Sequence, residues 1–107
     1  MTYIRSQLAS STVLNSATNT LSSSSSDQEI YVCSYSGNMT IELQSASSVG
    51  AGFKYIFKKT NLVNHDIDIS KNSSSSDTID GLTTISMGNP YSSLTLVSDG
   101  SSTFYLI

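Results

Sequence analysis

Hydrophobic and polar residues alternate along most of the chain after its first quarter. Residues 39–44 alternate aliphatic with polar side chains, residues 53–58 alternate aromatic residues with Lys and Ile, and residues 66–70 alternate Asp or Ser with Ile. A period of two residues is typical of a β-strand that buries one face. No segment of useful length has the period of an amphipathic helix. We therefore predict strands over these segments, with the aromatic side chains of the second one pointing inward.

Turn-forming residues separate further apolar runs and complete the strand pattern. The turn signals are residues 80–81 (Asp-Gly), 88–90 (Gly-Asn-Pro) and 99–101 (Asp-Gly-Ser). Further strands are expected at residues 28–34, 78–79, 82–87, 92–98 and 103–107. The last two strands are predicted to form a β-hairpin. About eight or nine short strands at such intervals predict an all-β fold, an antiparallel β-sandwich or jelly roll.

The first quarter of the chain is only weakly patterned. Residues 2–4 and 12–14 are candidates for short strands, and residues 22–26 are consecutive serines. Serine tracts bury no apolar surface and form flexible linkers. We therefore divide the chain into an N-terminal arm or attachment segment, residues 1–26, and a β-sandwich, residues 27–107. Alternatively, the residues before the serine run are part of the sandwich.

The composition argues against several classes of partner. Only 12% of the residues are charged, and the net charge is −3 with a pI near 4.7. Nucleic-acid-binding domains carry a basic patch, whereas the nearest candidate here is the trio Lys54, Lys58 and Lys59. No run approaches the ~20 apolar residues of a membrane helix, and no signal-peptide core is visible at the N-terminus. We therefore expect no nucleic-acid partner and no insertion into a membrane.

Few residues are candidates for chemistry. Cys33 is the only cysteine and lies in an apolar run, so a buried structural thiol is favoured over a reactive or intersubunit one. His65 has Asp66 beside it, but adjacent residues of a strand point to opposite faces. Asp66 and Asp68 share a strand face and could hold a cation, although a solvated face is the simpler interpretation. Because no nucleophile elbow, phosphate-binding loop or metal-ligand spacing occurs, we predict a non-enzymatic protein without cofactor or metal.

Two strands carry apolar side chains on both faces. Ile56 lies on the face that its strand otherwise gives to lysines, and the final strand has Phe104 and Leu106 on one side and Tyr105 and Ile107 on the other. Strands that are apolar on both faces need cover on both faces, and the chain lacks the charges that usually protect sheet edges. We predict that these five residues lie at the contacts of a homo-oligomer. The alternative is that a loop of the same chain covers the second face.

Several segments together resemble a known family. They are residues 36–43 (SGNMTIEL), 45–48 (SASS), 52–59 (GFKYIFKK), 77–81 (DTIDG), 91–100 (YSSLTLVSDG) and 104–107 (FYLI). In this order and spacing, the chain from residue 28 onward resembles the C-terminal β-domain of phage tail fibres and of structural proteins from large DNA viruses and their virophage-like satellites. The resemblance implies a homotrimeric tip on a fibre, at the virion surface and facing the host. The sequence departs from the family's pattern at Phe104, where Trp is common, and at Gln44, where Pro is common.

The function expected from these observations is that of a viral fibre or spike head domain for trimerisation and host attachment. Its partners are then copies of itself and a host-surface receptor or glycan, bound on the loops of residues 45–52, 61–66 or 71–77. The alternative is a carbohydrate-binding, lectin-like module of a surface protein or enzyme. In that case the stacking platforms would be Tyr31, Tyr35 and Tyr91.

Overall fold

The computed structural model describes residues 11–22, 27–60 and 65–107, and these residues form ten β-strands and one short helix. The elements in chain order are β1 (Ser11–Leu14), β2 (Thr18–Thr20), β3 (Gln28–Cys33), β4 (Met39–Glu42), α2 (Ala46–Val49), β5 (Ala51–Lys59), β6 (Ile67–Ser70), β7 (Thr78–Ile79), β8 (Thr84–Met87), β9 (Ser93–Asp99) and β10 (Thr103–Leu106).

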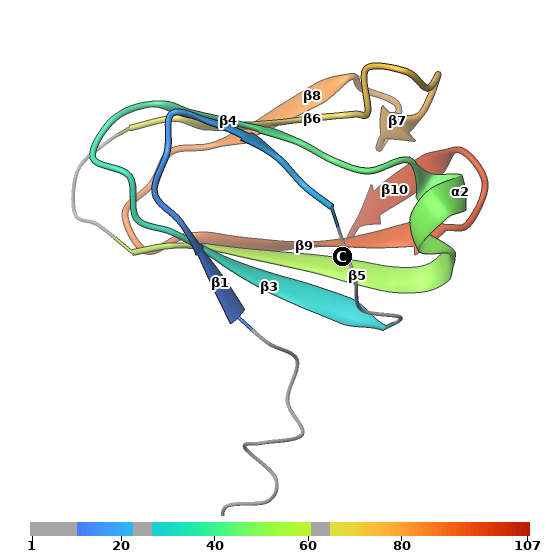
Figure 1. The fold of residues 1–107 in the computed structure, drawn as a ribbon, viewed down its shortest axis with the longest axis horizontal. Coiled ribbons are helices and arrows are strands. Elements are labelled where there is room, and N and C mark those ends of the chain that lie inside the picture. The colour runs from blue at the N-terminus through green and yellow to red at the C-terminus, as the bar shows by residue number, and fades with distance from the viewer. Residues whose placement is uncertain (1–10, 23–26, 61–64) are drawn as a thin grey trace, which may run out of the picture.

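The strands form two sheets that lie face to face as two layers (Figure 1). Sheet A has the order β1-β3-β5-β9-β10-β7, and sheet B has the order β2-β4-β6-β8. From β1 to β9 the chain crosses to the other sheet after every strand. As a result β1, β3 and β5 stack in parallel in sheet A, and β2, β4 and β6 stack in parallel in sheet B. This winding makes the arrangement solenoid-like.

The prediction of an all-β fold is confirmed, but the predicted antiparallel pairing is wrong for most of the strand pairs. Five of the eight strand pairs are parallel. The antiparallel pairs are β5–β9, β6–β8 and the β9–β10 hairpin, which was predicted. The two layers are joined as in a solenoid and not as in a jelly roll. A period of two residues indicates which face of a strand is buried, but it does not indicate which strand lies beside it.

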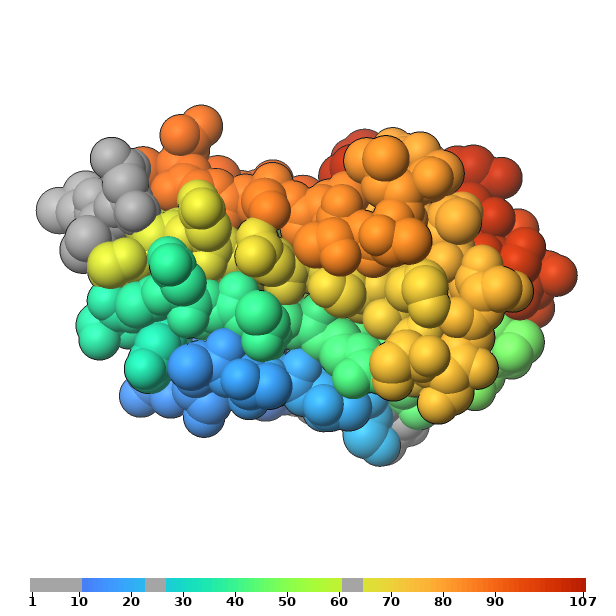
Figure 2. Space-filling view, turned by 90° about the horizontal axis from the view of Figure 1, so that it is seen from above, coloured from blue at the N-terminus to red at the C-terminus, as the bar shows by residue number. Residues whose placement is uncertain are grey.

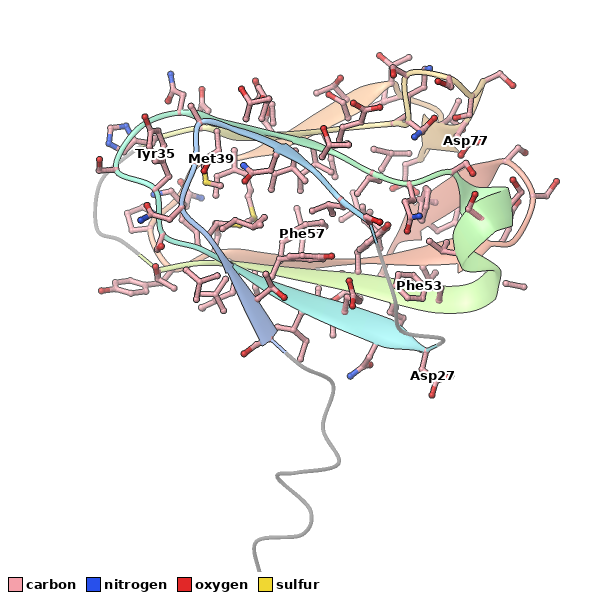
Figure 3. All side chains as sticks on the ribbon, in the orientation of Figure 1. Asp27, Tyr35, Met39, Phe53, Phe57 and Asp77 are labelled. Carbon is pink, nitrogen blue, oxygen red and sulfur yellow. The ribbon has the colours of Figure 1, made fainter. Side chains whose placement is uncertain are left out.

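The core lies between the two sheets. The predicted inward positions of Phe53, Tyr55 and Phe57 are confirmed, because none of these side chains is more than 1% exposed. Figure 3 shows Phe53 and Phe57 between the two sheets. The Tyr55 ring centroid lies 5.0 Å from that of Phe53, 5.8 Å from that of Phe57 and 5.7 Å from that of Phe104. Aromatic pairs at such separations contribute about 0.5–1.5 kcal/mol each beyond their burial. From sheet B the core receives Met39, Ile41, Ile67 and Ile69.

The inward pattern of β5 continues to Lys59, whose side chain is only 1% exposed. In the register Lys59 lies beside Cys33 of β3, which is also buried, so the prediction of a buried thiol is confirmed. The basic trio considered in the sequence therefore does not form one patch. Lys54 and Lys58 occupy the outward positions of the same strand, since successive side chains alternate between its faces.

The one-turn helix α2 lies within a segment that was expected to be a loop of small residues. The side chain of Ser45 caps the helix by accepting the N–H of Ser48. The carboxylate of Asp77 accepts the N–H of Ala46 at 2.7 Å, and the hydroxyl of Ser98 donates to the carbonyl of Ala46 at 3.1 Å. These bonds tie the helix to the loop before β7 and to β9.

Two of the predicted turns are confirmed with the backbone conformations that their sequences favour. Asp80 and Gly81 both have positive φ angles, 50° and 84°, as the central residues of a tight Asp-Gly turn do, and Ile79 and Leu82 on either side form an antiparallel bridge. In the β9–β10 hairpin Gly100 has a φ of 80°. A Cβ atom at Gly100 would lie 2.6 Å from the backbone N of Ala51, so the turn also needs the small residue. The carboxylate of Asp99 closes this turn by accepting three backbone N–H groups.

The described part of the predicted N-terminal arm, residues 11–22, supplies the first strand of each sheet. β1 pairs with β3 and β2 pairs with β4, and Leu14 and Leu21 are buried in the core. The strand predicted at residues 2–4 and most of the serine run lie outside the described residues. The role of this arm as an attachment segment stays a prediction.

Candidate functional site

The outer face of sheet A, on the side away from sheet B, carries a band of apolar side chains. Residues that are opposite each other in the register share a face. The register therefore places the outward residues in three rows across the strands: Gln28, Lys54, Val97 and Tyr105; Ser11, Ile30, Ile56, Thr95 and Ile107; Val13, Val32, Lys58 and Ser93. We define the outer apolar band as Val13, Ile30, Val32, Ile56, Val97, Tyr105 and Ile107.

The members of the band at its two ends are largely exposed. Val13 is 61% exposed, Tyr105 is 49% exposed and Ile107 is 70% exposed. The members between them, Ile30, Val32, Ile56 and Val97, are half-buried. Figure 1 shows sheet B and α2 on the inner side of sheet A and no described element on the outer side. A contiguous apolar patch that faces water in this way marks a site of contact with another molecule.

Three of the five residues predicted at a subunit contact lie in this band: Ile56, Tyr105 and Ile107. Leu106 points to the inner side of sheet A at its margin and is 40% exposed. The prediction is wrong for Phe104, because its side chain is fully buried in the core of its own chain. The split follows from the alternation along β10, which turns Phe104 and Leu106 to one face and Tyr105 to the other.

Sequence reasoning did not identify the other four members of the band. Val13, Ile30, Val32 and Val97 come from three strands that are distant in sequence. The available signal was that residues 30–33 are apolar on both faces of the strand, and that Val97 adds an apolar residue on the face opposite Leu94 and Leu96. Only the register shows that the outward halves of these runs adjoin one another.

Two lysines interrupt the band without removing its apolar character. Lys54 and Lys58 occupy outward positions of β5 on either side of Ile56. The ammonium group of Lys58 donates a hydrogen bond to the carbonyl of Tyr91, in the loop before β9. The methylene stem of such a lysine covers apolar surface while its charge stays at the margin. The face therefore has no charged residue in its middle row and carries one lysine in each of the two outer rows.

The residues considered for chemistry have structural partners in the fold. Burial raises the pKa of the Cys33 thiol to about 11. Asp68 accepts a hydrogen bond from the hydroxyl of Ser86 on the neighbouring strand, and the N–H of Asp66 donates to the side chain of Asn38 at 3.0 Å. Within the described residues, no group of three or more His, Cys, Asp or Glu side chains is placed to hold a metal ion. The prediction of a non-enzymatic protein is not tested by these contacts.

The tyrosines considered as platforms for sugar rings differ in their environment. Tyr31 is only 4% exposed, and its ring is stacked on Phe57. Burial, and then a hydrogen bond from its hydroxyl to Glu29, raise the pKa of Tyr31 above its ordinary value. Tyr35 packs against the core, whereas Tyr91 is 51% exposed. Tyr31 is therefore a core residue, and the prediction that it could stack on a ligand is wrong.

Comparisons with known proteins give this chain no family. No family model, no curated protein and no solved structure gives a significant match to it. The resemblance to fibre tips stays a prediction that rests on the sequence segments quoted above. In the part of the chain that the structure describes, no helix is long and apolar enough to cross a membrane.

Proposed function

We propose that this chain is a non-enzymatic structural domain that forms a homotrimer through the outer apolar band of sheet A, as the head of a viral fibre or spike. The observation that carries the proposal is the exposure of Val13, Tyr105 and Ile107 on a sheet face that no described element covers. The trimeric state and the location on a virion rest on the resemblance of the chain from residue 28 onward to fibre tips.

Association would be favoured because it removes these side chains from water. Burying a Val or Ile side chain completely contributes about 1.5–3 kcal/mol. The lost translational and rotational freedom of association costs about 4–15 kcal/mol. The three most exposed residues of each partner only just offset this cost, so the half-buried members must also be covered. A stable contact would therefore extend over the whole band, from β1 to β10.

The solution mass of the purified chain, measured by light scattering on a sizing column, is the first test. A mass near three times 11.4 kDa is expected. The variant Ile56→Lys places a charge in the middle row of the band and should shift the protein to the monomer with an unchanged circular dichroism spectrum. The matched control is Leu82→Lys, because Leu82 is 56% exposed outside the band, and this variant should keep the parent mass.

A stable monomer at the highest protein concentration measured would overturn the proposal. An Ile56→Lys variant that keeps the parent's oligomeric mass would show that the chains meet through another surface.

In a trimer formed through sheet A, the outer face of sheet B would point away from the other subunits. That face would then be open to a host molecule, which is the arrangement that host attachment requires.

A further inference from the structure

The outer face of sheet B contains a hollow of about 230 Å³. Figure 2 looks onto this face, with β2 in blue, β4 in green and β6 in yellow. The register places Thr18 beside Thr40, and it places Thr20 beside Glu42 and Glu42 beside Ser70. These side chains line the hollow, and the loop that follows β6 completes it. The lining is therefore carried by three hydrogen-bonded strands and is fixed by their pairing.

The loop at the rim is held in place by its own hydrogen bonds. Oε2 of Glu42 accepts both the N–H and the hydroxyl of Ser73, each at 2.9 Å. The ammonium group of Lys71 turns back onto the loop and donates to the carbonyl of Asn72 at 3.1 Å and to that of Ser75 at 2.6 Å. Both acceptors are neutral carbonyls, so Lys71 keeps its positive charge, which also helps to lower the pKa of Glu42. The negative charge of Glu42 faces the hollow.

Glu42 offers an acceptor to a ligand. Its second oxygen, Oε1, accepts no hydrogen bond from the residues that the structure describes, whereas Oε2 is occupied by Ser73. The N–H and the hydroxyl of Ser73 lower the pKa of Glu42. The carboxylate is therefore ionised at neutral pH, and an ionised carboxylate is a stronger acceptor than a neutral group.

The lining matches a ligand that carries many hydroxyl groups and no charge. Each threonine presents a methyl group, which can pack against C–H groups, and a hydroxyl. The hydroxyl of Thr40 donates to the carbonyl of Ala17 at 3.3 Å and would therefore accept from a ligand, whereas the hydroxyl of Thr20 can donate or accept. The carboxylate of Glu42 would accept from ligand hydroxyls, and Glu42 and Lys71 together leave the lining without a net charge that would attract an anion. The net charge of −3 also disfavours anions. Drug-sized ligands fill sites of about 300–1,000 Å³, so this hollow suits a single sugar ring.

We propose that the hollow binds one ring of a neutral saccharide, with Oε1 of Glu42 and the hydroxyls of Thr20 and Thr40 as its hydrogen-bonding groups. The rest of a longer glycan would continue across the open polar face of sheet B. This site lies on the opposite layer from the outer apolar band, and it does not depend on trimer formation.

The test is a titration of the full-length ¹⁵N-labelled chain followed by amide chemical shifts. The probes are the methyl glycosides of glucose, galactose, mannose and N-acetylglucosamine, at concentrations up to about 100 mM, because a Kd near or above 1 mM is a weak interaction of only about 4 kcal/mol. At least one probe should shift the amides of residues 18–20, 40–42 and 70–73 in a saturable manner. Amides of β9, on the opposite layer, should not move.

Two variants and a matched control test the assigned groups. Glu42→Gln should weaken binding at least tenfold, and the amide of Ser73 reports whether the rim loop stays in place. Thr20→Val replaces an exposed hydroxyl by a methyl group and should weaken binding several-fold without changing the fold. Thr95→Val makes the same replacement on the outer face of sheet A and should bind like the parent chain.

Three outcomes would overturn the saccharide proposal. The first is no saturable shift with any of the four probes. The second is binding that Glu42→Gln and Thr20→Val leave unchanged. The third is tighter binding of glucosamine, added as a fifth and cationic probe, that disappears with added salt, which would assign the hollow to cations. The solution mass of the same samples is measured independently, so a failure here is distinct from a failure of the trimer proposal.

Discussion

Asp77 joins parts of the chain that are far apart in sequence, and its replacement should destabilise the fold strongly. Its carboxylate accepts the N–H of Ala46 at 2.7 Å, and the carbonyl of Ala46 accepts the hydroxyl of Ser98 at 3.1 Å. Asp77 is 4% exposed and Ala46 is fully buried. In Asp77→Ala the N–H of Ala46 would lose its acceptor while it remains inside the protein. A buried donor without a partner is the physical basis of the expected effect.

The magnitude follows from the type of bond that is lost. A hydrogen bond to a charged group contributes about 1.5–3 kcal/mol, and an unsatisfied buried donor costs about 1–3 kcal/mol. We expect Asp77→Ala to lower the free energy of unfolding by about 2–3 kcal/mol, a large part of the roughly 5–15 kcal/mol of a typical domain. The corresponding fall in Tm is about 10–20 °C for a domain of this size. Asp77→Asn keeps an acceptor oxygen and should lose only about 1 kcal/mol.

The free energy of unfolding is measured by urea denaturation followed by far-ultraviolet circular dichroism. All variants are compared at one protein concentration, because the stability of an oligomer depends on concentration. The control is Ser74→Ala, in the same loop at an exposed position, which should change the free energy of unfolding by less than about 0.5 kcal/mol. Combining Asp77→Ala with Ser98→Ala should be non-additive by at least about 0.5 kcal/mol, because both side chains bind Ala46.

A result for Asp77→Ala within about 0.5 kcal/mol of the parent, with an unchanged denaturant m value, would refute this reasoning. Water would then replace the carboxylate, and the end of the molecule at α2 would be more open than its burial indicates. Additive effects of Asp77→Ala and Ser98→Ala would likewise show that the two side chains do not act through one shared residue.

Two further predictions follow from the shifted pKa values. The thiol of Cys33 is buried and its pKa is raised to about 11. Because the thiolate is the reactive form, Cys33 should react with a thiol reagent at neutral pH only after denaturant unfolds the chain. Fast reaction of the native protein would contradict the burial of Cys33. The pKa of Asp99 is lowered by the N–H groups of Ser101, Thr103 and Ser102, and that of Glu42 by Ser73. The two carboxylates stabilise the folded state fully above their ordinary pKa values of about 4. This stabilisation is lost as the pH falls through their lowered pKa values in the folded state. Urea unfolding at a series of acidic pH values should therefore show that the free energy of unfolding falls below about pH 4. The variants Asp99→Asn and Glu42→Gln should each make this fall less steep. Variants with the parent's acid profile would show that these carboxylates are not linked to folding.

The amino-acid sequence by itself determined the local features of this protein. Alternation with a period of two indicated which side chains of β4, β5 and β6 point inward, and the buried aromatic residues of β5 agree with it. The Asp-Gly pairs predicted the two turns with positive φ, and the short segment between the last two strands predicted their hairpin. These features depend only on residues near one another in the chain, because strand pleating and turn geometry are local properties.

The pairing of the strands was decided only by the tertiary structure. Ser11 pairs with Ile30, 19 residues further on, and Ile30 pairs with Ile56, 26 residues further on. These unequal intervals leave no fixed repeat in the sequence by which a solenoid-like winding could be predicted. Alternation alone fits an antiparallel neighbour as well as a parallel one, so the sequence pattern did not distinguish the two arrangements.

Both candidate surfaces depend on that pairing. The outer apolar band joins residues as distant as Val13 and Ile107, and the hollow joins Thr20 of β2 to Ser70 of β6 through Glu42. The sequence indicated that some strands are apolar on both faces, and it placed Ile56 and all of residues 104–107 at a subunit contact, although Phe104 is buried. The hydrogen bonds between distant strands determine which of these side chains lie next to one another. A surface is therefore a property of the folded register, whereas the face on which a residue lies is a property of its own strand.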